Sequence, residues 1–582
     1  MFYYVYLNKE FTVLSSELIL SNPIGPKIDS SITGLMLRDL DMHGIFTLID
    51  PRMDEDAAAS FAERYFSSDP DEISSRCAMI RSLSTLTGSA EFQEGIDALK
   101  ALSQENQKAK TASGRLAEVL YPWRRAAAYY RAINLWCRIL SGSPESSGNS
   151  QRLLAFRLYI NSLQNAPSFA QLSEALNQLD ELLPLPHYIH VGFNMREDGY
   201  PQEMGILSVS GHIDLRDEEH SEELPLNALL SFDDPTRPSL SIGPEFNYNR
   251  GLYGSHFDEY IARCLEKEWK GDLSKAAKIL ENMPALTELE NLISLIEPLQ
   301  FYQIALLFQE AFTGRGYTLT DPKPSADGSL IIKDALYPDF ILRDEGIKGN
   351  DIQLTRGNAL MITGANHSGK TSYLKTIGQI LVLAQLGLGV PASSMEFSPF
   401  HQIYTLFSAG EDSSMTASRM GVEVKKLSAI LKQAGENDLI LLNEPMTSTN
   451  PVEAVSICAD MTRHFLEKGI THLMVTHLYD IYFLLKSELP KDLFARLHSL
   501  VTESAYDSST GSMLHAYHLY EHEPLGNSYG RETAISYGIT LENMISVPES
   551  LVQARDYMKS QRIDQVYEGG GEVGLSDQPE SK

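Results

Sequence analysis

Apolar residues recur every three to four positions between about residues 71 and 183. The stretches 75–83, 116–120 and 153–160 show this spacing. Because a helix completes one turn in 3.6 residues, such spacing gathers the apolar side chains on one face. The pattern predicts a block of helices that pack against one another in an antiparallel array.

The period changes between Pro184 and Tyr253. Residues 187–194 and 204–210 alternate between apolar and polar positions, as half-buried strands do, and residues 196–199 form a turn signal between them. We therefore expect a small β insertion, followed by helices to about Phe312. Basic residues are sparse in it, so we interpret it as a hairpin that caps the helical array rather than as a DNA clamp.

Three short apolar runs mark the C-terminal half. They lie within residues 359–362, 438–443 and 470–476, and each has the length of a buried strand in a parallel sheet. Residues 373–388, which follow the first run, have the apolar spacing of a helix. Strands that alternate with helices predict an α/β domain.

A glycine-rich loop joins the first of these strands to its helix. Residues 364–371 satisfy the pattern G-x-x-x-x-G-K-[ST]. The backbone N–H groups of such a loop and the positive end of the helix face an anion, so we expect ATP phosphates here. Lys370 would reach the β/γ-phosphates, and the Thr371 hydroxyl would ligate Mg²⁺. The residues expected to bind the nucleotide are Gly364, Ala365, Asn366, His367, Ser368, Gly369, Lys370, Thr371 and Ser372.

The ends of the other two strands supply candidate catalytic groups. Glu444 follows the second strand and could polarise the attacking water, while Asn443, Glu444 and Thr371 are the predicted Mg²⁺ ligands. His477 follows the third strand, where ATPases of the ABC type carry a histidine that senses the γ-phosphate. These features in this order predict an ATPase in which Lys370, Glu444 and His477 are catalytic.

Further motifs are shared with one protein family. Residues 349–352 read Gly-Asn-Asp-Ile, residues 384–392 match A-Q-x-G-x-x-V-P-A, and residues 418–424 have the spacing of S-T-F-M-x-E-M. Near the end, residues 526–530 read Gly-Asn-Ser-Tyr-Gly. Over about residues 335–560 the chain resembles the MutS family of DNA mismatch-repair ATPases.

This resemblance implies a dimer. In the family two ATPase domains face each other, and the signature of one completes the phosphate site of the other. Ser418 would then contact the γ-phosphate held by Lys370 of the second subunit. The resemblance also implies DNA as a partner.

The chain departs from the family pattern at three places. Asn443 stands where the family usually has Asp, which removes a negative charge beside Mg²⁺ and predicts slow hydrolysis. Another carboxylate, such as Glu411 or Asp412, could compensate for it. The signature has Arg-Met at 419–420 in place of Thr-Phe, and residues 445–450 replace a glycine-rich stretch.

Length and composition bound the remaining expectations. With 582 residues the chain exceeds one ordinary core, and the four cysteines are too widely spaced for a zinc site or a disulfide framework. We see no membrane-spanning run and no signal sequence, so we expect a cytoplasmic protein. The net charge of −29, from 48 basic and 77 acidic residues, favours a protein partner or DNA binding confined to one surface.

The predicted fold is multidomain, α followed by α/β. We expect an N-terminal segment of unassigned role at 1–70, a helical lever or core domain at 71–330 with the β insertion at 184–253, an ABC-type P-loop ATPase domain at 331–562 and a disordered tail at 563–582. Too few residues precede the helical block to hold the mismatch-recognition domains of the family. The triplet Phe61-Ala62-Glu63 fits the mismatch-reading Phe-x-Glu wedge, but its acidic, Ala-rich surroundings favour chance.

Three functions remain open from the sequence. The first is a MutS-like ATPase whose ATP-gated homodimer acts on repair or recombination structures in DNA without reading mismatches. The second is a nucleotide-gated switch that binds a protein partner and no DNA. The third, an ABC transporter ATPase, would need a Leu-Ser-Gly-Gly-Gln-type signature that the sequence lacks.

Overall fold

The chain forms two compact units. The computed structural model describes residues 30–141, 150–185, 188–195, 197, 201–210, 262, 265–267, 269–343, 345–407, 419–507 and 512–525. Among these, residues 78–306 form one unit, called here the helical unit, and residues 30–77 and 307–525 form the other, called the sheet unit. The divisions fall within helices α5 (Pro70–Leu86) and α14 (Ile296–Thr313).

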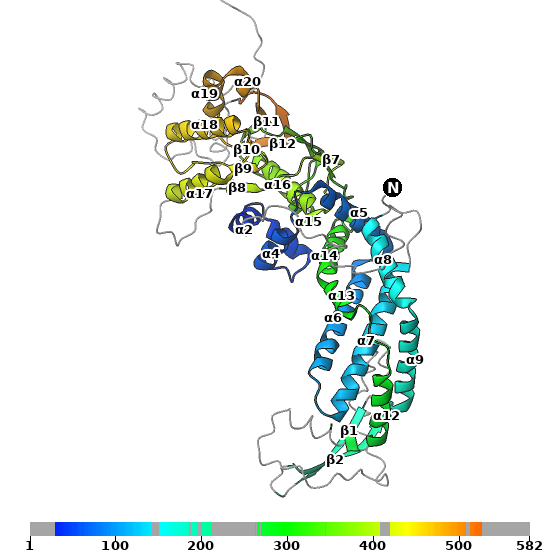
Figure 1. The fold of residues 1–582 in the computed structure, drawn as a ribbon. Helices are drawn as coiled ribbons and strands as arrows, with labels where there is room; N and C mark the ends of the chain where they lie inside the picture. The colour runs from blue at the N-terminus through cyan, green and yellow to red at the C-terminus, as the bar shows by residue number, and fades with distance from the viewer. Residues whose placement is uncertain are drawn as a thin grey trace, which may run out of the picture. The chain divides into compact units, whose positions relative to one another are not determined.

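Long helices build the helical unit, as the apolar spacing predicted. α7 lies at its centre and contacts α6, α8, α9 and α12 (Figure 1). Gly95 of α6 allows the close approach of α7, because a Cβ there would lie 2.7 Å from the Trp136 ring. The Trp136 indole in turn donates to the Gly95 carbonyl over 3.0 Å. The helices are α6 (Ser89–Lys110), α7 (Arg115–Ser141), α8 (Gln151–Gln164), α9 (Pro167–Leu182), α12 (Lys270–Glu281) and α13 (Leu289–Ser294).

The predicted β hairpin is present in the helical unit. β1 (Tyr188–Met195) pairs antiparallel with β2 (Pro201–Ser210). This pairing confirms that the two segments with alternating apolar and polar residues are strands of one hairpin. The remainder of the predicted insertion, to residue 253, lies outside the described residues.

Two sheets build the sheet unit. One has the strand order β12-β11-β6-β10-β9-β8, in which all pairs are parallel except β11 with β12, and the other has the order β3-β7-β4-β5. The three predicted buried strands are β6, β9 and β10, which confirms these predictions. The strands are β3 (Lys323–Pro324), β4 (Ser329–Ala335), β5 (Asn350–Thr355), β6 (Ala359–Thr363), β7 (Ser394–Phe397), β8 (Ile403–Phe407), β9 (Leu439–Asn443), β10 (Thr471–Val475), β11 (Leu497–Asp507) and β12 (Ser512–Glu521).

Helices cover both faces of the six-stranded sheet. Ile440 and Leu442 of β9 belong to the apolar cluster formed with α18, whereas Leu441 between them contacts α16 at Gly378. Because successive strand residues point to opposite faces, α16 and α18 lie on opposite sides. The helices of this region are α15 (Pro338–Leu342), α16 (Lys370–Leu386), α17 (Arg419–Gln433), α18 (Pro451–Lys468), α19 (Asp480–Glu488) and α20 (Lys491–Phe494).

The N-terminal segment, whose role the sequence left open, is part of the sheet unit. It contributes α2 (Ser30–Asp39), α3 (Met42–Ile49), α4 (Glu55–Tyr65) and the start of α5. Two of its contacts reach α16: the buried Gln379 amide donates to the Leu40 carbonyl over 2.7 Å, and Arg76 donates to the Leu386 carbonyl over 3.3 Å. The compact units divide at 77/78 and 306/307, near the domain boundaries predicted at 70/71 and 330/331. The predicted domain boundaries stay predictions.

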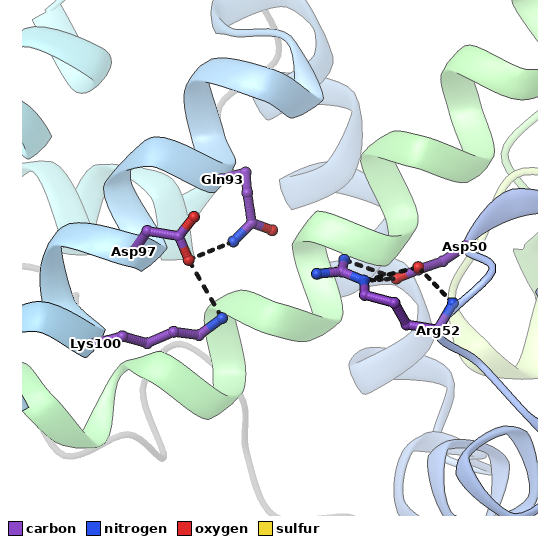
Figure 2. Close-up of polar contacts among 5 residues, drawn as sticks. All are labelled: Asp50, Arg52, Gln93, Asp97 and Lys100. Atoms are coloured by element: carbon purple, nitrogen blue, oxygen red, sulfur yellow. Dashed lines mark hydrogen bonds and ion pairs between the residues drawn. The ribbon is translucent and has the colours of Figure 1, made fainter. Parts of the chain in front are cut away.

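Local ion pairs stabilise each unit separately. In the sheet unit, Arg52 binds Asp50 through two of its nitrogens at 2.9 Å, and this hydrogen bonding lowers the pKa of the Asp50 carboxyl (Figure 2). In the helical unit, Asp97 of α6 accepts from Gln93 at 2.8 Å and from Lys100 at 3.3 Å (Figure 2). The α6 pairs are exposed, so each contributes only a few tenths of a kcal/mol (roughly) to helix stability.

Three minor expectations can be compared with the structure. Phe61 is buried and packs against Phe46 and Tyr65 at ring-centre separations of 5.6 and 5.1 Å, so it is a core residue of α4. The described cysteines, at positions 77, 137 and 458, are buried and are not in disulfide bonds. Within the described residues one stretch, Leu289–Thr313, has the length and composition to cross a membrane, but 56% of its apolar 18-residue window is buried, as in an ordinary core helix.

The buried His472 predicts a pH-dependent stability. Burial between β6 and β9 lowers its pKa from 6.5 to about 4. Between these values the unfolded chain binds a proton that the folded chain does not, so stability should fall as the pH falls, by about 3 kcal/mol in total. His472→Leu should flatten this dependence in urea unfolding at pH 7 and pH 5. His401→Leu, at an exposed position, is the control. If the unfolding free energy of His472→Leu changes with pH as much as that of wild type, His472 is not the cause of the pH dependence.

Candidate nucleotide-binding site

The glycine-rich loop lies between β6 and α16, where the sequence placed it. Gly364 has a φ of 138°, and a Cβ there would lie 1.9 Å from the Thr502 hydroxyl of β11. Gly369 has a φ of 91° and precedes the first turn of α16. Both glycines are therefore required by the path of the loop. That path presents the first N–H groups of α16, which have no acceptor within the helix, at the mouth of a cleft.

Lys370 is folded back over the loop. Its ammonium donates to the carbonyls of Gly364 and Ala365 at 3.0 and 2.6 Å. Burial lowers its pKa, and the nearby Glu444 opposes this shift. Its position suits a phosphate ligand, because an anion at the loop could draw the ammonium away from two neutral acceptors.

Two of the predicted metal ligands touch each other. The Thr371 hydroxyl donates to the Asn443 side-chain oxygen over 2.9 Å. Among the described residues no cluster of three or more His, Cys, Asp or Glu side chains could hold a metal by itself. The pair fits Mg²⁺ bound with a nucleotide, since that ion takes few protein ligands and completes its shell with phosphate oxygens and water.

Glu444 and His477 form a pair at the ends of β9 and β10. The His477 Nε2 lies 2.8 Å from the Glu444 carboxylate, and this hydrogen bond is the main cause that lowers the pKa of Glu444. Since a carboxylate only accepts, the Nε2 atom carries the proton. Glu444 has a φ of 51°, which costs an ordinary residue about 1 kcal/mol or more. Its N–H donates to the Val475 carbonyl over 2.8 Å, which helps to hold this conformation.

These groups share an open cleft of about 1320 Å³. It is lined by residues 366–373 together with Glu444 and His477. Residues from other parts of the sheet unit also line it, among them Tyr337, Phe340, Ile347, Lys348, Asn350, Tyr517 and Leu519. The cleft therefore combines anion-binding groups with apolar and aromatic side chains, as a nucleotide requires.

The structure brings most of the predicted site residues together. Asn366 to Ser372, Glu444 and His477 line the cleft, and Asn443 reaches it through its bond with Thr371. Gly364 and Ala365 contribute the carbonyls that hold Lys370. Ser418, Glu411 and Asp412 lie outside the described residues, so their predicted roles stay predictions.

The sequence analysis missed the contributions of β11 and β12. The Thr502 hydroxyl of β11 lies 2.7 Å from that of Ser368 and braces the loop. Tyr517 of β12 has a φ of 52°, and its ring lies 3.3 Å from where a Cβ on Gly369 would be. The Asn350 amide donates to the Tyr517 carbonyl over 3.0 Å. The β-branched and aromatic residues at 497–507 and 512–521 were a strand signal that could have revealed them.

Comparison with known proteins shows that the part of the chain that carries this site resembles one family. The family model for MutS domain V matches residues 360–562, which include the loop, Asn443, Glu444 and His477. This part of the chain is similar to the MutS family. The relatives that it matches include the human "MutS protein homolog 4" and the "DNA mismatch repair protein MutS" of Thermus aquaticus.

These similarities to MutS proteins concern one half of the chain. Identity to the human relative is 27% over 282 residues, or 47% of this chain and 28% of the relative. Identity to the Thermus aquaticus relative is 30% over 246 residues, or 42% of this chain and 29% of the relative. The match supports an ATPase domain of the MutS type and spans less than a third of either relative.

The contact between Thr371 and Asn443 predicts a weak metal site. Asn443→Asp is nearly isosteric, so its effect should come from the added charge beside the ion. We expect the half-saturating Mg²⁺ concentration for nucleotide turnover to fall and the turnover rate to rise about fivefold. A Mg²⁺ titration of both proteins checks this. Coincident curves would instead favour compensation by another carboxylate.

Proposed function

We propose that this protein binds and hydrolyses ATP with Mg²⁺, and that ATP gates a homodimer that acts on DNA without reading mismatches. The observation that supports this most directly is the shared cleft, which unites the phosphate loop, the Thr371–Asn443 pair and the Glu444–His477 pair. A MutS-family ATPase domain makes ATP the expected nucleotide.

Each residue has a defined role in this proposal. The loop N–H groups and Lys370 bind the phosphates, while Thr371 and Asn443 hold Mg²⁺, which would neutralise charge on the phosphate oxygens. Glu444 is ionised because His477 lowers its pKa, so its carboxylate can orient a water for attack. His477 donates from Nε2 and can turn that donor to a phosphate oxygen.

The dimer part of the proposal rests on the family resemblance. Ser418 would approach the phosphates bound by the second subunit, so that ATP joins the two sheet units. A ligand that binds only the joined state shifts the population toward it. The DNA part rests on relatives such as the Thermus aquaticus protein, which is named a DNA mismatch repair protein.

A second candidate is a nucleotide-gated switch that acts on a protein. The net charge of −29 supports it, because DNA affinity depends largely on Lys and Arg neutralising phosphates. In both candidates we expect no mismatch reading by Phe61, because its ring is buried in the sheet unit and cannot enter a base stack. The two candidates differ in whether DNA binding exists at all.

Lys370→Ala tests the phosphate site. We expect ATP affinity to fall by at least about a hundredfold, because the variant loses the cation that a phosphate would engage. A titration with a fluorescent ATP analogue measures this, and circular dichroism checks the fold. Lys432→Ala, at an exposed position in the last turn of α17, is the control. Unchanged affinity in Lys370→Ala would refute the nucleotide site.

A salt series separates the two candidate functions. If the protein binds DNA, affinity for a duplex with ATP present should fall steeply between 50 and 200 mM salt, by roughly a hundredfold or more. Mismatched and fully paired duplexes should bind within about threefold of each other, since no base-reading contact is expected. Fluorescence anisotropy measures both. No binding at 50 mM salt would favour the protein-partner candidate.

A further inference from the structure

Glu423 connects helix α17 to the loop that follows Glu444. One oxygen of its carboxylate accepts from the Met446 N–H over 2.5 Å, and the other accepts from the Ser448 hydroxyl over 2.9 Å. Both donors lie within four residues of Glu444. A carboxylate that accepts two hydrogen bonds from one loop fixes the position of that loop more firmly than a single contact would.

The loop needs such support because its backbone is strained. Met446 has a φ of 63° and Glu444 a φ of 51°, although neither is glycine. The Met446 side chain is buried in the apolar cluster of the sheet, so it cannot relax outward. Each left-handed residue costs about 1 kcal/mol or more, which surrounding contacts must offset.

The loop is held from two sides. On the β10 side, Glu444 bonds to the Val475 carbonyl through its N–H and to His477 through its carboxylate. On the other side, the carboxylate of Glu423 binds Met446 and Ser448. Glu444 therefore lies between one contact set that belongs to the sheet and one that belongs to α17.

We propose that Glu423 is a positioning residue for hydrolysis: its paired hydrogen bonds to Met446 and Ser448 set the orientation of Glu444. This inference rests on the proposed ATPase function. It assigns a role to Ser448, which stands in the stretch where this chain departs from the glycine-rich pattern of its family.

The proposal also links two parts of the site. α17 begins at Arg419, directly after Ser418, the residue expected to meet the nucleotide of the second subunit. Because Glu423 lies one turn into the same helix, a displacement of the start of α17 would move the anchor of the Glu444 loop. A change in the position of the signature segment would thus change the orientation of the Glu444 carboxylate.

Four variants of the full-length protein test the role of Glu423. Glu423→Ala removes both bonds, and Glu423→Asp keeps the charge but shortens the side chain. Glu423→Gln keeps the length, can still accept from Met446 and can donate to the Ser448 hydroxyl. Ser448→Ala removes one bond. Lys432→Ala, exposed in the last turn of α17, is the matched control.

We expect turnover to separate from binding. kcat should fall about tenfold or more in Glu423→Ala and Glu423→Asp and about threefold in Ser448→Ala, while ATP affinity stays within about threefold of wild type. Glu423→Gln and Lys432→Ala should keep wild-type kcat. Phosphate release gives kcat, a fluorescent ATP analogue gives affinity, and thermal melting identifies any variant that fails to fold.

The failures are distinguishable. Wild-type kcat in Glu423→Ala, or a loss in Glu423→Gln as large as in Glu423→Ala, would overturn the positioning role. An equal loss of ATP affinity and kcat would assign Glu423 to nucleotide binding and would also overturn it. If wild-type protein neither binds nor hydrolyses ATP, the proposed function itself fails, and the inference fails with it.

Discussion

The sheet unit depends on satisfying the polar side chains of its buried central helix. α16 presents Gln379 and Gln385 to the interior, and both are fully buried. An unpaired buried amide would cost about 1–3 kcal/mol, so each must find partners. Gln379 joins the carbonyl of Leu40 to the N–H of Asp339, and Gln385 joins Ser67 to Phe400. The amides thus determine which segments can cover the helix.

This constraint positions the chemistry. The N-terminus of α16 presents the phosphate loop, and its C-terminus ends at Gly387, which has a φ of 79°. A Cβ on Gly387 would lie 2.6 Å from the Cβ of Arg76, so that only glycine lets α5 approach. A helix fixed at both ends and along its length cannot rotate freely. Its first turn therefore keeps Thr371 beside Asn443 at the ends of the parallel strands.

Sequence patterns predicted those parts of the fold and site that depend on neighbouring residues. The strands β6, β9 and β10 and the phosphate loop follow from local apolar runs and one motif, and parallel pairing brings their ends together. The docking of residues 30–77 was not predictable in this way, because Gln379 and Leu40 are 339 residues apart. The strands that carry Thr502 and Tyr517 had a local signal, but the contacts of these two residues with the loop join distant parts of the chain and had none.

The sheet unit is built from two separate chain segments, so the ribosome makes its first helices long before the rest of the unit. Arg76 leaves the ribosome 310 residues before Leu386, the carbonyl that it binds. At ordinary rates of synthesis this interval is roughly 15–60 s. During that time the helical unit can fold, whereas α2 to α5 wait with an uncovered apolar face. The first helices made in the sheet unit therefore depend on later residues for burial, and are exposed to proteases and chaperones until α16 emerges.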